Sequence, residues 1–143
     1  MSEVKRISRE AMFKSIVTIL SERSTCTRRQ VGALLIRDNR IIAMGYNGSP
    51  SGLPHCEDVG CLIGPDGGCI RTVHAEANVI AFAAKEGIET KGATLYVTLE
   101  PCLTCAKLII NAGITHVMCL EKYDRSWDGV LLLESAGVKV TYV

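Results

Sequence analysis

The sequence has few aromatic residues and almost no net charge, and both properties limit the classes of function that the protein can have. Only 5% of its 143 residues are aromatic, and its formal net charge is +1. Proteins that bind large nucleic acids need a basic surface for the phosphates, and single-strand binders add aromatic side chains on which bases stack. We therefore expect no nucleic-acid partner, although Arg28 and Arg29 could form a small local basic patch.

Long apolar runs are also missing. No segment approaches the ~20 apolar residues that a membrane span needs, and the first ten residues, MSEVKRISRE, lack the apolar stretch of a secretory signal. We therefore expect a cytoplasmic protein without a membrane partner. Seven cysteines, an odd number, also argue against a disulfide framework in such a protein.

The hydrophobic pattern predicts a single α/β domain over residues 1–143. Ser8 is a candidate N-cap, and Asp38-Asn39 is a candidate hairpin turn. Alternating elements in the second half predict a sheet with parallel strands covered by helices. The glycine-rich segment 45–72 predicts a long loop with no pattern of its own. The expected helices are 8–22, 74–86, 102–112 and 126–135, and the expected strands are 31–36, 40–44, 94–98, 115–120 and 138–143.

Two short motifs predict a metal site. The first is His74-Ala75-Glu76, and the second is Pro101-Cys102-Leu103-Thr104-Cys105. One imidazole and two thiolates leave a tetrahedral zinc one open position for water, which is the arrangement of catalytic sites. Each motif is expected in the first turn of a helix, with Pro101 at the helix start, where positive partial charge favours thiolates. Alone, the two cysteines could equally be a redox pair or half of a structural zinc site.

Glu76 is the predicted proton shuttle of this site. It follows His74 too closely to be a comfortable fourth ligand, but it could take a proton from a zinc-bound water and pass it on. The alternative is a surface glutamate that the helix dipole favours in the first turn.

Several segments resemble the cytidine/deoxycytidylate deaminase superfamily, and within it the deoxycytidylate (dCMP) deaminases. The resemblance covers residues 8–143. It implies a three-layer α/β/α domain with a central five-stranded mixed sheet, and hydrolysis of dCMP to dUMP and ammonia for thymidylate synthesis. The segments that carry it are the two metal motifs, Ser24-Thr25-Cys26-x-Arg28, Val31-Gly32-Ala33, Gly45-Tyr46-Asn47-Gly48-Ser49-Pro50-Ser51-Gly52, Asn78 and Tyr123-Asp124.

The resemblance also implies roles for further residues. Asn47 is expected to bind the deoxyribose hydroxyl, the backbone N–H of Ala75 the pyrimidine carbonyl, and Tyr123 to pack against the base. Asn47 could instead occupy a left-handed turn, and Tyr123 could be a core residue. Arg28 and Arg125 are the candidate phosphate ligands, because a guanidinium can clamp a phosphate in two places; each could equally be a solvated surface arginine.

The remaining cysteines form a second candidate metal site. Cys26, Cys56, Cys61 and Cys69 cannot all reach the first zinc, and the resemblance implies a structural zinc bound by residues like Cys26 and Cys56. We predict a closed four-ligand zinc site from these cysteines, with His55 as a substitute for one. Unconnected free thiols are the alternative. Cys119, in an apolar run, is expected to be a buried thiol.

Many dCMP deaminases are hexamers activated by dCTP and inhibited by dTTP, with Mg²⁺ under the triphosphate. The resemblance therefore implies a homo-oligomer, possible dCTP and dTTP effectors and possible Mg²⁺. The expected effector element is the GYNGSPSG loop of residues 45–52, with Gly45, Tyr46, Asn47 and Gly48 as its binding residues, because its glycines would present backbone N–H groups to phosphate.

Three other functions compete with this interpretation. The chain could be a related deaminase that acts on free cytosine, a nucleoside or tRNA adenosine, although near-neutral charge argues against a large RNA. It could prefer a modified dCMP, which depends on the space beside C5. It could also be a non-catalytic zinc-binding module, but His74, Cys102 and Cys105 are one ligand short of a structural site.

Overall fold

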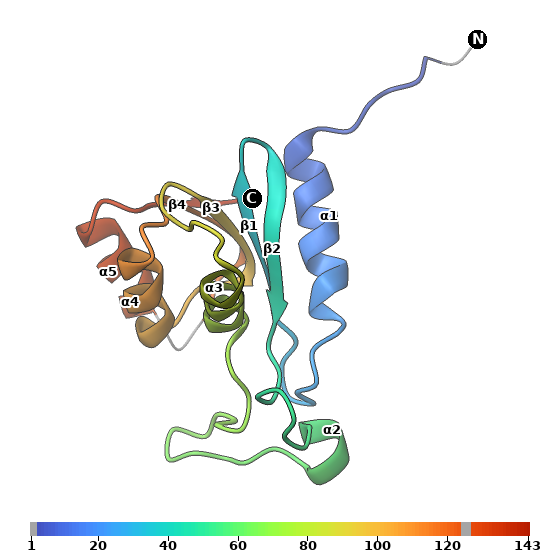
Figure 1. Cartoon of the computed structure of the whole chain (residues 1–143), viewed down its shortest axis with the longest axis vertical. Helices are drawn as coiled ribbons and strands as arrows, with labels where there is room; N and C mark the ends of the chain where they lie inside the picture. The colour runs from blue at the N-terminus through green and yellow to red at the C-terminus, as the bar shows by residue number, and fades with distance from the viewer. Residues whose placement is uncertain (1–2, 124–126) are drawn as a thin grey trace.

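Residues 3–123 and 127–143 are described by a computed structural model (Figure 1). Every predicted helix and strand is present, with ends within two residues of those expected. The elements in chain order are α1 (Arg9–Ser21), β1 (Gly32–Arg37), β2 (Arg40–Tyr46), α2 (Cys56–Val59), α3 (Ala75–Glu86), β3 (Thr94–Leu99), α4 (Leu103–Asn111), β4 (His116–Glu121), α5 (Trp127–Ser135) and β5 (Lys139–Tyr142).

The five strands form one mixed sheet with the order β2-β1-β3-β4-β5. Strand β1 is antiparallel to both of its neighbours, whereas β3, β4 and β5 are parallel to one another. The predicted hairpin turn joins β1 and β2: Asp38 and Asn39 have φ angles of 51° and 62°. Two successive left-handed residues are what a two-residue hairpin turn requires, and Asp and Asn tolerate that conformation.

Helices cover both faces of the sheet, which confirms the predicted fold class (Figure 1). On one face, Phe13 and Val17 of α1 pack against Leu34 and Tyr96. Helix α1 begins as predicted, since the Oγ of Ser8 accepts a hydrogen bond from the Ala11 N–H at 3.0 Å. On the other face, α3, α4 and α5 bury a larger apolar cluster against the sheet, and its members include Val79, Ala83, Leu95, Ile109, Val117 and Leu133.

The segment between β2 and α3 contains more structure than the sequence predicted. It includes the four-residue helix α2, and its two ends are joined by an antiparallel bridge between Gly48 and Val73. The two hydrogen bonds of that bridge measure 3.2 and 2.8 Å. The prediction of a loop without pattern is therefore wrong here. A helix of one turn is too short to show a hydrophobic period in the sequence. Tertiary contacts rather than helix propensity stabilise such a helix.

Helices α3 and α4 each begin one residue later than predicted. His74 and Cys102 are consequently N-cap residues with extended backbone, and Pro101 lies before the cap rather than at the helix start. No helix among the described residues is long and apolar enough to cross a membrane.

Candidate metal centres and active-site cleft

The predicted metal ligands His74, Cys102 and Cys105 come together where α3 and α4 begin. The Nδ1 atom of His74 lies 3.4 Å from the Sγ atoms of both cysteines. A tetrahedral zinc with bonds of about 2.3 Å to sulfur and about 2.0 Å to nitrogen separates such atoms by about 3.5 Å. The three donors therefore fit a zinc ion and leave its fourth position for another ligand. We call these residues the metal trio.

The electrostatics of the metal trio favour one ionised sulfur, that of Cys102, whereas the hydrogen bond with Cys102 and burial raise the pKa of Cys105. The hydrogen bond from the Cys105 thiol, followed by the interaction with His74, lowers the pKa of Cys102 to about 4. The same thiolate raises the pKa of His74 through their hydrogen bond. Both effects favour a negatively charged Cys102 sulfur next to a protonated His74 imidazole.

Glu76 is buried beside the metal trio, so the alternative of a surface glutamate is wrong. Its side chain is only 4% exposed. Burial raises the pKa of its carboxyl to about 7, although His74 acts in the opposite direction. A carboxyl that titrates near neutral pH can both accept and donate a proton under physiological conditions.

Helix α5 packs against the backbone of Pro101 and Cys102, and Gly129 is its residue at this contact. A Cβ atom added at Gly129 would collide with the carbonyl oxygen of Pro101 and lie 3.0 Å from the carbonyl carbon of Cys102. The backbone that carries Cys102 therefore packs directly on α5, and only glycine permits this close approach.

The metal trio opens into a cavity of about 280 Å³. This cavity contacts every described residue that the sequence predicted for substrate binding; Arg125 lies outside the described residues. Residues from five parts of the chain line it, and they include Cys26, Arg28, Arg29, Asn47, Cys69, Thr72, His74, Ala75, Glu76, Glu100, Cys102 and Tyr123. The cavity thus has two arginines as well as the acidic Glu76 and Glu100, which suits a ligand with an anionic part and a polar ring.

Asn47 organises one side of the cavity. It is 6% exposed, its Oδ1 accepts a hydrogen bond from the Val31 N–H at 2.8 Å, and its Nδ2 donates to the Arg29 carbonyl at 2.7 Å. Asn47 does not have a positive φ, so the alternative of a left-handed turn is wrong. One hydrogen of Nδ2 and one lone pair of Oδ1 remain for a ligand.

Among the cavity residues that sequence reasoning did not assign to the site, two are charged, namely Arg29 and Glu100. The Arg29 guanidinium lies 4.9 Å from the centre of the Tyr123 ring, a cation–π contact that directs both side chains to the cavity. Glu100 is 7% exposed and accepts a 2.6 Å hydrogen bond from the hydroxyl of Tyr142. The available signals were sequence neighbours: Arg29 follows Arg28, and Glu100 precedes Pro101-Cys102.

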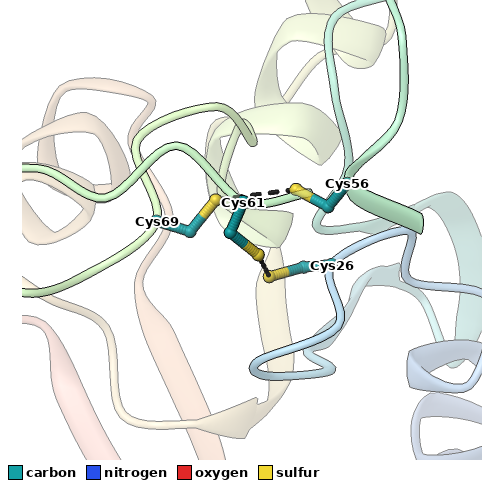
Figure 2. Close-up of side chains that lie close together, drawn as sticks. All are labelled: Cys26, Cys56, Cys61 and Cys69. Atoms are coloured by element: carbon teal, nitrogen blue, oxygen red, sulfur yellow. Dashed lines mark hydrogen bonds between the residues drawn. The ribbon is translucent and has the colours of Figure 1, made fainter. Parts of the chain in front are cut away.

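The other four predicted metal ligands also come together (Figure 2). The Sγ atoms of Cys26, Cys56, Cys61 and Cys69 all lie within 4.8 Å of one another, so the alternative of unconnected thiols is wrong. The pairs Cys26–Cys61 and Cys56–Cys69 are 3.9 and 3.6 Å apart. Neighbouring sulfurs of a tetrahedral Zn–S₄ site are about 3.8 Å apart. We call these residues the four-cysteine cluster.

Thiol ionisation differs within the four-cysteine cluster. Burial raises the pKa of Cys56 to about 12. Burial acts in the same direction on Cys69, but backbone hydrogen bonds from Arg71 and Leu62 and the Cys56 thiol together lower its pKa to about 6. A hydrogen bond from Thr27 lowers the pKa of Cys61. His55, the predicted substitute, is not part of the cluster, and its buried Nδ1 has no hydrogen-bond partner among the described residues.

The predicted effector residues are more engaged with the fold than expected. Gly45 and Tyr46 belong to strand β2, and a Cβ atom at Gly45 would lie 2.9 Å from the backbone nitrogen of Val79 in α3. The N–H of Gly48 donates to the Val73 carbonyl. The expectation that Gly48 presents its N–H to a phosphate is therefore wrong. Cys119 is fully buried in β4, as predicted.

Comparisons with known proteins agree with this geometry. Residues 7–121 match the family described as the cytidine and deoxycytidylate deaminase zinc-binding region. The chain is 47% identical to ComE operon protein 2 of Bacillus subtilis over 140 residues, which are 98% of this chain and 74% of that protein. It is 34% identical to the deoxycytidylate deaminase of Saccharomyces cerevisiae over 98% of this chain, but spans only 46% of that enzyme.

A solved structure shows the same fold. The dCMP deaminase of cyanophage S-TIM5, in complex with dCMP and dUMP, superimposes with a TM-score of 0.84 at 30% identity, covering 98% of this chain and 100% of that one. Together with the match over residues 7–121, this establishes that the chain is a deaminase and belongs to the cytidine and deoxycytidylate deaminase family.

Proposed function

We propose that this chain, as a single domain over residues 1–143, hydrolyses dCMP to dUMP and ammonia. The observation that carries the proposal is the cavity, which joins the metal trio and buried Glu76 to Arg28 and Arg29. In dCMP, the cytosine ring would bind at the Glu76 end of the cavity and the phosphate at the arginine end. The complex of the cyanophage enzyme with dCMP and dUMP supports the same ligand.

The metal trio would hold a zinc ion, which lowers the pKa of a bound water to about 7. Glu76 would accept one proton from the attacking water and deliver it to the ring nitrogen while the water oxygen bonds to C4. It would then take the second proton from the new C4 hydroxyl and pass it to the amine, so that the C–N bond breaks, ammonia leaves and the carbonyl of dUMP forms. The Glu76 pKa of about 7 suits both steps. Ala75, the first residue of α3, has an N–H without an intrahelical partner and would donate it to the pyrimidine carbonyl.

The phosphate and sugar would be held by the other side of the cavity. Arg28 and Arg29 are the proposed phosphate ligands in the described part of the chain, and Arg125 stays a prediction. Tyr123, steadied by the Arg29 guanidinium, would pack against the base. Asn47 would use the free hydrogen of its amide to bind a deoxyribose hydroxyl.

We propose a second, structural zinc in the four-cysteine cluster. Four sulfur ligands at tetrahedral separations form a closed site, with no position for water. The cluster needs no nitrogen ligand, so His55 does not act as a substitute.

The remaining parts of the proposal rest on the family resemblance. They are activation by dCTP, inhibition by dTTP, Mg²⁺ under the triphosphate, a hexameric assembly, a cytoplasmic location and a supply of dUMP to thymidylate synthesis. Adding dCTP or dTTP to the assay below, with and without Mg²⁺, tests the regulation directly.

The decisive experiment follows the loss of cytosine absorbance with dCMP, deoxycytidine, dCTP and cytosine in parallel, on zinc-loaded protein. Rapid deamination of dCMP alone is expected. Equal activity on deoxycytidine or cytosine would remove the phosphate role from Arg28 and Arg29. Activity only on 5-methyl- or 5-hydroxymethyl-dCMP would identify a modified substrate, and activity on none of these would contradict the proposal.

A further inference from the structure

The segment 49–72 has no hydrophobic core of its own. Within it, Cys56 is the only buried residue. Five large apolar side chains are between 48% and 62% exposed, namely Leu53, Val59, Leu62, Ile63 and Ile70. Since burial of apolar surface is the main stabilising force in folding, some other interaction must hold this segment in place.

Few hydrogen bonds hold this segment against residues 24–31. Within the described chain, every hydrogen bond between residues 24–31 and 60–72 ends on the sulfur of Cys61. Its partners are the Cys26 sulfur at 3.9 Å and the Thr27 hydroxyl at 3.5 Å. Sulfur is a weak donor and acceptor, so these contacts alone tie the two stretches loosely.

Both stretches form walls of the substrate cavity. Cys26, Arg28 and Arg29 come from the first, and Gly68, Cys69 and Thr72 come from the second. The four-cysteine cluster takes Cys26 from the first stretch, Cys61 and Cys69 from the second, and Cys56 from α2 (Figure 2). Two cluster members therefore line the cavity in which the substrate is proposed to bind.

We infer that zinc in the four-cysteine cluster sets the nucleotide affinity of the cavity. The ion cross-links residues 26–29 to residues 68–72 and so holds the arginine wall in position for the phosphate. It takes no part in the chemistry, because the cluster leaves no ligand position open. This inference rests on the proposed function, since it assumes dCMP as the ligand.

The test measures binding and turnover separately. Cys56→Ser/Cys61→Ser removes two cluster ligands, neither of which lines the cavity. In a Glu76→Gln background, which binds without turnover, the double variant should hold one zinc ion instead of two, and its Kd for dCMP should rise about tenfold or more. With Glu76 restored, KM should rise similarly while kcat changes by less than about threefold. Cys119→Ala, a buried cysteine outside both clusters, should keep both zinc ions and the original Kd.

Three results would overturn the inference. They are loss of one zinc with unchanged Kd and KM, retention of two zinc ions, and a fall in kcat instead of a rise in KM. Failure of the proposed function looks different, because Glu76→Gln with all cysteines intact would then not bind dCMP at all.

A second measurement avoids cysteine substitution, in case the double variant does not fold. Metal-free Glu76→Gln protein is titrated with Co²⁺, whose absorption distinguishes a four-sulfur site from a mixed nitrogen–sulfur site. The affinity for dCMP should increase about tenfold as the four-sulfur band appears. An affinity that does not follow that band contradicts the inference.

Discussion

The two candidate metal centres of this chain are positioned by different means. His74 and Cys102 are N-caps of helices whose core-facing residues, such as Val79 and Ile109, are fully buried. Three members of the four-cysteine cluster, Cys56, Cys61 and Cys69, instead lie in the segment 49–72, whose large apolar side chains are exposed. The fold thus positions the ligands of the metal trio by itself, whereas on our proposal the four-cysteine cluster would need a bound zinc ion to order the chain around it.

This difference corresponds to the roles proposed for the two sites, catalysis for the metal trio and structural support for the four-cysteine cluster. A site that the fold preorganises can keep one coordination position open, because its ligands do not depend on the metal for their placement. A site that organises a loop fills all four positions, since each sulfur adds one constraint on the chain.

The largest expected effect is on turnover at the metal trio. Glu76→Gln keeps the size of the side chain but removes the proton acceptor, so kcat should fall by about 10³-fold or more. Zinc content and melting temperature should be retained. Glu86→Gln, at the exposed end of the same helix, is the matched control and should leave kcat unchanged. Loss of zinc or of the fold in Glu76→Gln would instead favour a purely structural metal.

The second prediction contrasts the core with the loop. Ile109→Ala removes a fully buried side chain from α4 and should lower the free energy of unfolding by about 2–5 kcal/mol. Ile70→Ala makes the same change at a side chain that is 62% exposed, and should cost less than about 0.5 kcal/mol. Denaturant unfolding of zinc-loaded protein measures both. Equal losses would show that the segment 49–72 has a packed core after all.

Metal removal should loosen the two centres unequally. After chelation, amide hydrogen exchange in residues 49–72 should accelerate by about a hundredfold, because local opening no longer breaks metal–sulfur bonds. Exchange in the middle of α3 should change far less, since Val79 and Ala83 remain buried. Mass spectrometry of labelled peptides distinguishes the segments. Uniform acceleration along the chain would contradict the comparison.

The smallest expected effect is on the zinc affinity of the metal trio, and it tests the contact with α5. Gly129→Ala places a Cβ against the backbone of Pro101 and Cys102, so the affinity of the metal trio for zinc should fall about tenfold. The affinity of the four-cysteine cluster should not change. Ser135→Ala, at the end of the same helix, is the control. Competition with a chromophoric chelator measures both affinities, and an equal loss at both centres would show a general destabilisation.

Much of this molecule could be predicted from its sequence, because the informative patterns are local. Hydrophobic periodicity located nine elements, and Asp38-Asn39 marked the hairpin. The metal trio followed from two short motifs whose residue types suit zinc. The four-cysteine cluster was predicted by excluding its members from the first site, and by the family resemblance.

The rest depends on contacts between distant segments. Whether a helix begins at His74 or one residue later depends on the backbone conformation of His74, which is extended, and spacing alone does not reveal this. Arg29 acquires its place from Tyr123, almost a hundred residues away in the chain, and Glu100 from Tyr142. Neither pairing leaves a trace in periodicity or composition.

The bridge between Gly48 and Val73 has a consequence for how this chain tolerates change. It closes the base of the long segment one residue beyond Asn47 and one residue before His74. Residues added beyond it therefore lengthen an excursion whose two ends are already joined, and the entropic penalty of a longer loop grows only slowly with its length. Insertions between the bridge and the cysteines leave the start of α3 where it is, which insulates His74 from the length of its largest neighbouring loop.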